Sequence, residues 1–323
     1  MVSIEKLQQS FEQSLTTLAI SGNPQELYEP INYLLSLGGK RMRPVLLMAG
    51  CDLFDGKMSK AILPALGMEI FHNFSLMHDD IMDNSPLRRS KPTVHEKWDA
   101  NTAILSGDAM LVEAYNMMMQ VDDDLLRPIL AEFSTAAIRV CEGQKMDMLF
   151  ETRIVSIDDY IHMISLKTAV LLAASLKIGG MIARAATEDV ENLAEFGLNL
   201  GIAFQLQDDI LDVYGDKSKF GKQVGGDIIA NKKTYLLLKA FELADDKTRE
   251  SLTELIEKKD FIAKEKVEKI TAIFNLLNIK QIAEQEMRGY HKMAMDSMAA
   301  IKLNDEKKEI LITLANNLMN RES

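Results

Sequence analysis

Two groups of aspartates, each at the end of an apolar run, constrain this chain more than any other feature. The first group is Asp79, Asp80 and Asp83 after the run 70–77, and the second is Asp208, Asp209 and Asp212 after the run 197–204. In a helix the first and third acids of a group lie one turn apart on a shared face, and the second acid lies about 100° around the axis. All three acids can therefore reach one polar cleft at the end of a buried helix.

A cluster of acids on a helix is most often a solvated face or a favourable partner for the helix dipole. A second copy with the same spacing, again after an apolar run, argues against that interpretation. Like charges this close repel each other unless cations compensate them, and basic residues follow both copies. Hard oxygen ligands suit Mg²⁺, which usually takes one or two carboxylates together with phosphate oxygens and water. We therefore expect the six aspartates to bind Mg²⁺ and, through it, a diphosphate.

Composition excludes several other classes of function. The net charge of −11 and the pI of about 5.1 argue against a nucleic-acid partner, because such proteins normally present a basic surface. The N-terminus lacks the pattern of a signal peptide, and no uncharged apolar run approaches the roughly 20 residues of a membrane helix. We expect a soluble, cytoplasmic protein without a transmembrane segment, in which Cys51 and Cys141 are buried thiols.

The apolar pattern is helical throughout, and no convincing strand alternation, Rossmann glycine fingerprint, P-loop or zinc spacing occurs. Ser156 followed by Asp159 predicts a helix N-terminus, and Gly179-Gly180 predicts that the same helix is relaxed there. We expect one all-α domain over residues 1–323, with helices at 4–20, 25–37, 43–53, 59–83, 101–121, 124–150, from 156 onwards, at 188–214 and within 235–321. The two helices that carry the acids should face a shared central cavity.

Further marks occur in order along the chain: Gly38-Gly39-Lys40-Arg41-Met42-Arg43-Pro44, Arg88-Arg89, Lys167-Thr168, Gln205, Lys222 and Lys232. Lys40, Arg41 and Arg43 beside paired glycines indicate an anion-binding loop. With the two aspartate motifs in their places, the order resembles that of the trans-isoprenyl diphosphate synthases, the polyprenyl synthetases that include farnesyl and geranylgeranyl diphosphate synthases. The resemblance covers nearly the whole chain and implies an isoprenoid synthase type helical bundle around a central cavity.

The resemblance also implies an enzyme, a transferase of prenyl groups. Such enzymes condense isopentenyl diphosphate with an allylic diphosphate (dimethylallyl, geranyl or farnesyl), give farnesyl or geranylgeranyl diphosphate, and release diphosphate. The allylic carbon–oxygen bond ionises because Mg²⁺ and basic side chains stabilise the departing diphosphate. Three Mg²⁺ ions with diphosphate bound, and a homodimer, are expected on the same grounds.

Roles for single residues follow from the same resemblance. The expected metal ligands are Asp79, Asp83 and Asp208, with Asp80, Asp209 and Asp212 in support. Isopentenyl diphosphate is expected at Lys40, Arg43, His72 and Arg89, and the allylic diphosphate at Arg88, Lys167, Thr168, Gln205, Lys222 and Lys232. The catalytic group is Lys167, Asp208, Lys222 and Lys232. The resemblance places Gln144 and Asp147 near the cleft and matches Asp227 and Asn231 to diphosphate and metal contacts. The loop 215–226 should close over the diphosphates.

The length of the product depends on the wall of the apolar cavity. Phe74 lies five residues before Asp79, about 7.5 Å along the helix axis, a distance comparable with one to two isoprene units. In the family an aromatic residue at this position marks short products and an alanine marks long ones. The adjacent Ser75 is small, unlike the second aromatic residue that farnesyl synthases have there. With Phe71, Phe74 and Ser75 as the chain-length residues, we predict a product of fifteen to twenty carbons, leaning to twenty. The alternative is that Phe74 is an ordinary core residue.

Two other functions are open at this point. A terpene cyclase has the same helical bundle and first aspartate motif, but its second metal site usually contains Asn, Ser and Glu at wider spacing. A non-catalytic subunit that modulates a partner synthase is expected to have lost one motif. Both motifs are intact here, and the second reads Asp-Asp-Ile-Leu-Asp, so the sequence favours chain elongation.

Overall fold

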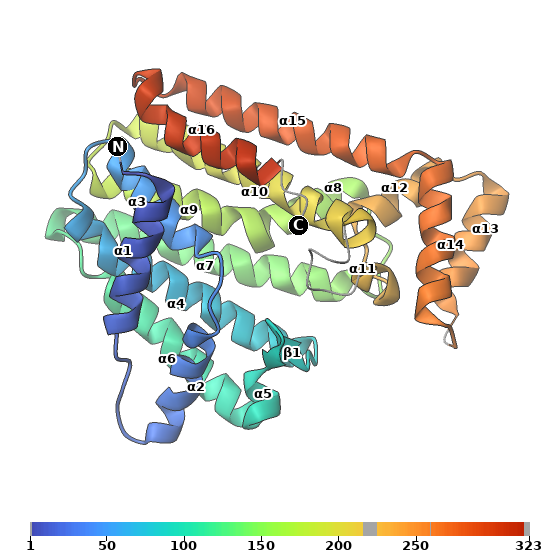
Figure 1. Ribbon diagram of the computed structural model, residues 1–323, viewed down its shortest axis with the longest axis horizontal. Coiled ribbons are helices and arrows are strands. Elements are labelled where there is room, and N and C mark those ends of the chain that lie inside the picture. Colours follow the sequence, from blue (N-terminus) through green and yellow to red (C-terminus); the bar gives the residue numbers. More distant parts are fainter. Residues whose placement is uncertain (1, 216–224, 259, 320–323) are drawn as a thin grey trace. The chain divides into compact units, whose positions relative to one another are not determined.

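The computed structural model describes residues 2–215, 225–258 and 260–319, and within these ranges the chain is all-α apart from one short hairpin (Figure 1). The first elements are α1 (Ile4–Thr17), α2 (Gln25–Ser36), α3 (Met42–Leu53), α4 (Met58–Met82), β1 (Leu87–Arg88), β2 (Lys91–Pro92), α5 (Val94–Lys97), α6 (Ala100–Met118) and α7 (Asp123–Phe150). The later ones are α8 (Ile157–Ile164), the π-helix η1 (Ser165–Ala169), α9 (Val170–Ile182), α10 (Thr187–Tyr214), α11 (Gly226–Ile229), α12 (Tyr235–Leu243), α13 (Asp246–Glu257), α14 (Ala263–Leu276), α15 (Ile279–Ala300) and α16 (Asp305–Met319). Lys222 and the loop around it lie outside the described residues.

The chain forms two compact units, each assembled from three segments. Unit 1 comprises Met1–Ala136, Leu171–Ala194 and Ile301–Ile310, and unit 2 comprises Ala137–Val170, Glu195–Ala300 and Leu311–Ser323. The first aspartate motif belongs to unit 1 and the second to unit 2. A single domain over residues 1–323 stays a prediction, and so does the cavity shared by the two motifs.

In unit 1, helix α4 is the central element and packs against α1, α2, α3 and α6 (Figure 1). Its middle is buried around the whole circumference, because every residue from Pro64 to Phe71 is buried. A helix that is apolar all round belongs in a core. The polar end of α4 is therefore held in place by many neighbours, and that end carries the first aspartate motif.

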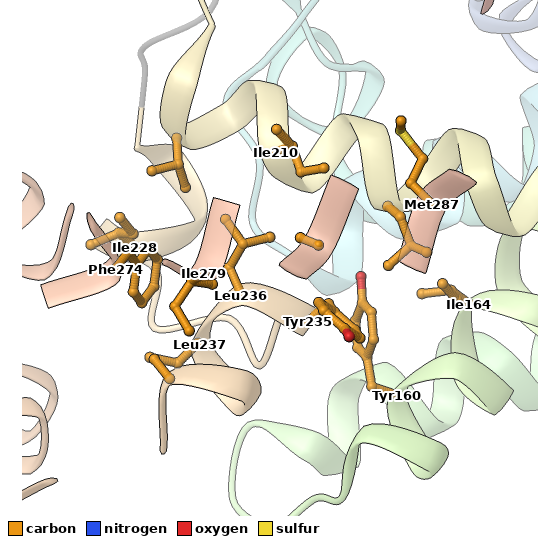
Figure 2. Packing of buried hydrophobic residues seen from close by; sticks show 14 of the residues in the cluster. Tyr160, Ile164, Ile210, Ile228, Tyr235, Leu236, Leu237, Phe274, Ile279 and Met287 are labelled. Carbon is orange, nitrogen blue, oxygen red and sulfur yellow. The ribbon is translucent and has the colours of Figure 1, made fainter. Parts of the chain in front are cut away.

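Unit 2 has its own core, to which α8, α10, α12, α14 and α15 contribute side chains (Figure 2). Ile210, which lies inside the second aspartate motif, packs in this core together with Ile164, Leu236 and Met287. Burial of Ile210 fixes the rotation of α10 about its axis. The acids of the motif are oriented by that rotation.

The helices predicted from the sequence are confirmed to within a few residues, for example 59–83 as Met58–Met82. The predicted start of α8 is confirmed as a capping box, in which Ser156 and Asp159 satisfy each other's backbone N–H groups. The predicted relaxation at Gly179-Gly180 is wrong, because α9 continues through both. Gly179 is a packing residue instead: a Cβ there would lie 2.1 Å from the carbonyl oxygen of Leu47. The irregular turn of this region is η1, earlier in the chain.

The expectation for the cysteines is confirmed at Cys51 and wrong at Cys141. Cys51 is fully buried, and burial raises the pKa of its thiol to about 11. Cys141 is exposed, because it lies on the outer face of α7 next to the 61% exposed Ile138. Only the thiol of Cys141 is therefore placed to meet a reagent from solvent.

One continuous helical stretch, Ile157–Ile182, is long and apolar enough to cross a membrane by length and composition alone. It comprises α8, η1 and α9. From the sequence we had expected no apolar run of this length. In the structure, 56% of the most apolar window of Ile157–Ile182 is buried inside the protein. Core helices pass the same test, so the stretch is weak support for a membrane span. The cytoplasmic location stays a prediction.

Candidate functional site

The first aspartate motif forms the C-terminal end of α4. Asp79 is half-buried, while Asp83 is exposed and caps the helix, and the backbone N–H of Asp83 donates to the Asp79 carbonyl at 2.8 Å. Asp80 is 2% exposed and is bonded to Arg88, whose Nε and Nη2 each donate to a different oxygen of Asp80 at 2.7 Å. The guanidinium fork thus uses both oxygens of Asp80. Asp79 and Asp83 are the other two acids of the motif, at the same end of α4.

The hairpin of β1 and β2 carries the two predicted arginines. Its central residues, Arg89 and Ser90, have φ angles of 52° and 62°, as the tightest hairpin turns require. The guanidinium of Arg89 lies against Gly39, where a Cβ would be only 2.6 Å from Nη2. Because Gly39 has no side chain, Arg89 can lie beside the loop that contains Lys40.

Four arginines surround His72. Arg43 Nη1 lies 3.1 Å from His72 Nε2, and because a guanidinium can only donate, the imidazole must accept. Burial, and then the charges of Arg43, Arg88, Arg89 and Arg41, hold the pKa of His72 well below its usual range. The ring is therefore neutral. The structure thus brings Arg43, His72 and Arg89 together, as predicted, in a strongly positive environment.

Arg43 also has an unused donor. Its Nε is buried without a hydrogen-bond partner among the described residues. Burial lowers the pKa of Arg43 to about 10, so the side chain is still a cation at neutral pH. A buried donor of this kind needs an acceptor. An anion beside His72 would supply one.

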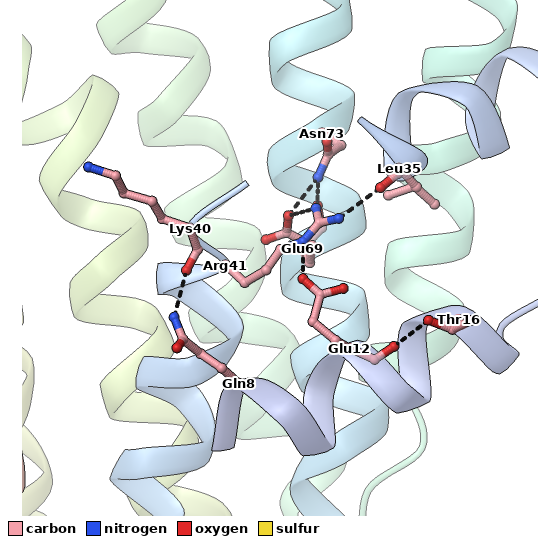
Figure 3. A network of polar contacts seen from close by, with 8 residues as sticks. All are labelled: Gln8, Glu12, Thr16, Leu35, Lys40, Arg41, Glu69 and Asn73. Carbon is pink, nitrogen blue, oxygen red and sulfur yellow. Dashed lines mark hydrogen bonds and ion pairs between the residues drawn. The ribbon is translucent and has the colours of Figure 1, made fainter. Parts of the chain in front are cut away.

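The prediction that Arg41 binds an anion is wrong, because its guanidinium is buried and fully engaged inside unit 1 (Figure 3). Its Nη1 donates to Glu69 at 2.6 Å, its Nε to Glu12 at 3.0 Å, and its Nη2 to the carbonyl of Leu35 at 2.7 Å. Asn73 donates to the same Glu69 oxygen at 3.0 Å. Glu69 is a carboxylate in the middle of the core helix α4, and Arg41 is the charge that compensates it.

This buried pair anchors the loop that presents the cations. Arg41 has a φ of 48° and precedes α3, and its side chain ties that turn to α4. The Lys40 side chain extends away from Arg41 and is exposed, while its carbonyl accepts from Gln8 at 3.3 Å (Figure 3). Lys40 and Arg43 are therefore held on either side of a fixed residue.

The predicted chain-length residues lie in an aromatic cluster on α4. Phe74 is 9% exposed, and its ring centroid lies 5.5 Å from that of Phe71 and 4.8 Å from that of His78. Phe71 in turn stacks edge-on against Phe133 at 5.3 Å. Ser75 is half-buried and donates to the carbonyl of His72 at 2.8 Å. Control of chain length by Phe71, Phe74 and Ser75 stays a prediction.

In unit 2, the predicted pair Lys167-Thr168 lies in η1, a single π-helical turn between α8 and α9. Such turns are rare and occur often at functional sites. Lys167 Nζ lies 2.6 Å from Asp147 Oδ2, and Thr168 Oγ1 donates to Gln205 Oε1 at 3.2 Å. The π turn therefore directs two neighbouring side chains toward α7 and α10 at once.

Asp209 is the buried acid of the second motif, 3% exposed. It accepts hydrogen bonds from the hydroxyl of Tyr160 and, at 3.2 Å, from Nε2 of Gln205. Burial and then the charge of Asp227 raise the pKa of Asp209 to about 8. A cation nearby would lower it again.

A cavity of about 110 Å³ joins these groups. Five predicted site residues line it, namely Lys167, Thr168, Gln205, Asp209 and Lys232, together with Asp147 and Asp227. Asp208 and Asp212 are half-buried, and Asp212 Oδ2 accepts the backbone N–H of Asp227 at 3.0 Å. Lys232 Nζ lies 3.8 Å from Asp227 Oδ1. The second motif and α11 therefore form one connected polar surface.

The acids present fit Mg²⁺ only if a ligand completes its shell. In the described part of the chain, no three acids, histidines or cysteines converge closely enough to hold an ion by themselves. Mg²⁺ usually takes one or two carboxylates and obtains the rest from phosphate oxygens and water. Asp79 with Asp83, and Asp208 with Asp212, are donor pairs of that kind. Metal binding by all six aspartates stays a prediction.

Sequence reasoning missed Glu69 and Tyr160. Glu69 had a usable signal, since it is a carboxylate inside a run that is otherwise apolar and must be compensated when buried. Tyr160 had a weaker one, because a tyrosine on an apolar helix face usually finds a partner for its hydroxyl. Which partner it finds depends on how α8 and α10 pack, and no local pattern contains that information.

The profile of the polyprenyl synthetase family matches residues 24–275. The chain belongs to this family. It is 37% identical over 295 residues to a geranylgeranyl diphosphate synthase of Saccharolobus solfataricus, a match that covers 90% of this chain and 88% of the relative. A geranylfarnesyl diphosphate synthase of Natronomonas pharaonis is 39% identical, with 67% and 69% covered. A crystal structure of a geranylgeranyl pyrophosphate synthase matches with a TM-score of 0.95 and 39% identity, and each chain is covered completely.

Membership identifies the polyprenyl synthetase described here as a trans-isoprenyl diphosphate synthase, a transferase of prenyl groups. The predicted all-α isoprenoid synthase fold is confirmed by the same comparison. The site of unit 1, with Arg43, His72 and Arg89, and the cavity of unit 2, with Lys167 and Lys232, are then two candidate diphosphate sites in a prenyl transferase.

Proposed function

We propose that this polyprenyl synthetase condenses isopentenyl diphosphate with an allylic diphosphate (dimethylallyl, geranyl or farnesyl) and gives farnesyl or geranylgeranyl diphosphate. Family membership supports the reaction class. The observation that carries the assignment of sites is the unit 2 cavity, in which Lys167, Thr168, Gln205 and Lys232 meet. The cavity is lined by three lysines (Lys167, Lys232 and Lys233), neutral donors and three carboxylates. Ammonium donors beside carboxylates that can hold a metal ion suit a diphosphate better than an uncharged ligand.

The allylic diphosphate is proposed to lie in this cavity. Lys167 and Lys232 would neutralise its charge as the carbon–oxygen bond breaks, and Thr168 and Gln205 would orient it. Asp147 holds Lys167 at 2.6 Å and thereby keeps its ammonium at the wall of the cavity. The resemblance to the family also assigns Arg88 and Lys222 to the allylic diphosphate; Arg88 is held by Asp80 in unit 1, and Lys222 lies outside the described residues.

Isopentenyl diphosphate is proposed to bind at Lys40, Arg43, His72 and Arg89. The buried Nε of Arg43 is an open donor for a phosphate oxygen. His72 is neutral there, so its ring can accept from Arg43 while its other nitrogen donates. Lys40 and Arg89 would add charge from the exposed side.

Mg²⁺ would supply Lewis-acid stabilisation of the charge that develops on the leaving group. Its proposed ligands are Asp79, Asp83 and Asp208, with three ions in all when the diphosphate is bound. Asp80 and Asp209 are proposed to act as supporting residues, because both are buried and already bonded, to Arg88 and to Tyr160. Asp212 would support the site through its bond to the backbone of Asp227.

The reaction then needs no protein base. The allylic carbon–oxygen bond breaks, and its electron pair leaves with the diphosphate that Lys167 and Lys232 neutralise. The double bond of isopentenyl diphosphate attacks the allylic cation, so a carbon–carbon bond forms. One proton is lost to the departing diphosphate, and a new double bond results. The protein's task is to hold both diphosphates and exclude water from the cation.

The homodimer is proposed to form through the outer face of α6. Leu105 and Val112, one face of that helix, are each 60% exposed, and Ile104 and Met119 flank them. Exposed apolar side chains at seven-residue steps lie on one face of a helix, and such a face is typical of an interface. Leu105→Glu should shift the protein from dimer to monomer in light scattering, whereas Ile262→Glu, at a 64% exposed site before α14, should not. A monomeric wild type would refute the dimer.

The assay that tests the function offers purified protein isopentenyl and dimethylallyl diphosphates with Mg²⁺ and identifies products by mass spectrometry. We expect both substrates to be consumed and diphosphates of fifteen or twenty carbons to appear. A terpene cyclase would consume only an allylic diphosphate and release a hydrocarbon. A non-catalytic subunit would consume neither substrate, and either result would refute the proposal.

A further inference from the structure

Lys266 is a buried lysine on α14, outside the residues to which the sequence assigned a role in the site. It lies on the apolar face of α14 together with Ile270 and Phe274, and it is 2% exposed. Its Nζ lies 2.5 Å from Asn231 Oδ1 and 4.2 Å from the ring centroid of Phe261. No ion pair of Lys266 with a carboxylate occurs among the described residues. Burying a cation with so few partners costs free energy, so the contact with Asn231 stands out.

Asn231 directly follows Ala230, the C-cap residue of α11. Its φ is 55°, and its N–H donates to the carbonyl of Ile228 at 3.2 Å, while the N–H of Lys232 donates to that of Asp227 at 2.9 Å. These two bonds form a Schellman motif, whose left-handed residue is usually glycine and less often asparagine. Asn231 Nδ2 also donates to the carbonyl of Ile256 at 3.2 Å. The side chain of Asn231 thus faces α13 and α14.

The turn at Asn231 determines where two cavity residues lie. Lys232 follows it directly, and Asp227 accepts one of its two backbone bonds. Both line the unit 2 cavity, and Asp227 is bonded in turn to Asp212 of the second aspartate motif. A change in the turn would therefore move an ammonium and a carboxylate at the proposed allylic diphosphate site.

We propose that Lys266 is a positioning residue for the allylic diphosphate site: it holds the side chain of Asn231 in the left-handed turn and thereby aims Lys232 and Asp227 into the cavity. This rests on the proposed function for the identity of the ligand. The expectation that Asn231 itself contacts diphosphate or metal is replaced by this role, because both ends of its amide bond to protein groups.

The test replaces Lys266 by methionine, which keeps the length of the side chain and removes the ammonium. We expect the KM for the allylic diphosphate to rise about tenfold, which is the effect of about 1.4 kcal/mol, and the KM for isopentenyl diphosphate to stay within twofold. Lys269→Met is the matched control, because Lys269 is exposed on the same helix, and it should leave both constants unchanged. Equal KM values for Lys266→Met and wild type would overturn the proposal.

A second variant separates positioning from a general loss of packing. Glycine adopts the left-handed turn without help from a side chain, so Asn231→Gly in the Lys266→Met background should restore the KM for the allylic diphosphate. No restoration would show that Lys266 does not act through Asn231. If Lys266→Met does not fold, Asn231→Ala and Asn231→Gly are compared with Lys266 present. The alanine variant should have the higher KM, and equal values would refute the role.

A measurement without substrate keeps this proposal distinct from the proposed function. Amide hydrogen exchange of residues 226–234 should be faster in Lys266→Met than in Lys269→Met, because the turn loses its anchor. Unchanged exchange would overturn the positioning role even in an active enzyme. Faster exchange in a protein that consumes no isopentenyl diphosphate would support the positioning of the turn and refute the function.

Discussion

Gly143 on α7 is the residue whose replacement should disturb the site most specifically. A Cβ at this position would lie 2.3 Å from the backbone nitrogen of Lys167 and 2.7 Å from its Cα. Ordinary contact begins near 3.4 Å, so Gly143→Ala requires η1 to move by roughly 1 Å. The turn cannot simply retreat, because a Cβ at Gly201 of α10 would be 2.6 Å from Ala169 on η1. The clash is therefore with backbone on a turn packed against two helices.

The expected change in the free energy of unfolding of Gly143→Ala follows from two opposing effects. Overpacking of a core usually costs about 1–3 kcal/mol, while replacing glycine by alanine in a helix returns about 1 kcal/mol. We expect Gly143→Ala to lower the free energy of unfolding by at most about 2 kcal/mol. Displacement of a catalytic group by about 1 Å costs about a hundredfold in rate, so kcat for prenyl transfer should fall about a hundredfold in a protein that is still folded.

The measurement is steady-state prenyl transfer together with thermal unfolding. Gly289→Ala is the control, since nothing lies within 4 Å of a Cβ there and the site is in the middle of α15. It should keep full activity and unfold at the same or a slightly higher temperature. If Gly143→Ala matched Gly289→Ala in both rate and stability, the reasoning about η1 would be refuted.

Three further outcomes are expected. Glu69→Gln removes the charge that compensates the buried Arg41, so it should lower the free energy of unfolding by about 3 kcal/mol and raise the KM for isopentenyl diphosphate. Stability is measured by chemical denaturation, and an unchanged free energy of unfolding would contradict this. Phe74→Ala should lengthen the product, measured by radiolabelled thin-layer analysis. An unchanged product length would show that Phe74 does not limit chain length. Iodoacetamide at pH 8 should modify Cys141 and spare Cys51, whose pKa of about 11 keeps the thiol protonated. The modified residues are identified by peptide mass spectrometry, and modification of Cys51 would contradict its burial.

Much of the fold could be predicted because the apolar period is local information. The start of α8 at Ser156, the extent of α4 and the position of the acids at its end all follow from neighbouring residues. The π turn could not be predicted, because it depends on the close approach of α7 and α10 through Gly143 and Gly201. Nothing in the residues of η1 themselves distinguishes it from an ordinary helix.

The candidate site divides in the same way. The kinds of residue and their order indicated diphosphate chemistry, and Lys167, Thr168, Gln205 and Lys232 do meet in one cavity. The direction in which each side chain points could not be predicted from the sequence. Arg41 looked like Lys40 and Arg43 in the sequence, but it points into the core of unit 1 because Glu69 is there. The same holds for Lys266, whose neighbour Asn231 is distant in the chain.

Prenyl transfer before and after removal of divalent ions tests the account at its centre. Purified protein is freed of metal with a chelator, offered isopentenyl and allylic diphosphates, and then given Mg²⁺ in excess. We predict that incorporation of labelled isopentenyl units falls to background in the chelator and returns with Mg²⁺, and that Asp79→Asn and Asp208→Asn stay near background at any Mg²⁺ concentration. Undiminished transfer in the chelator, or in both variants, would contradict the claim that the aspartates act on diphosphate through bound metal.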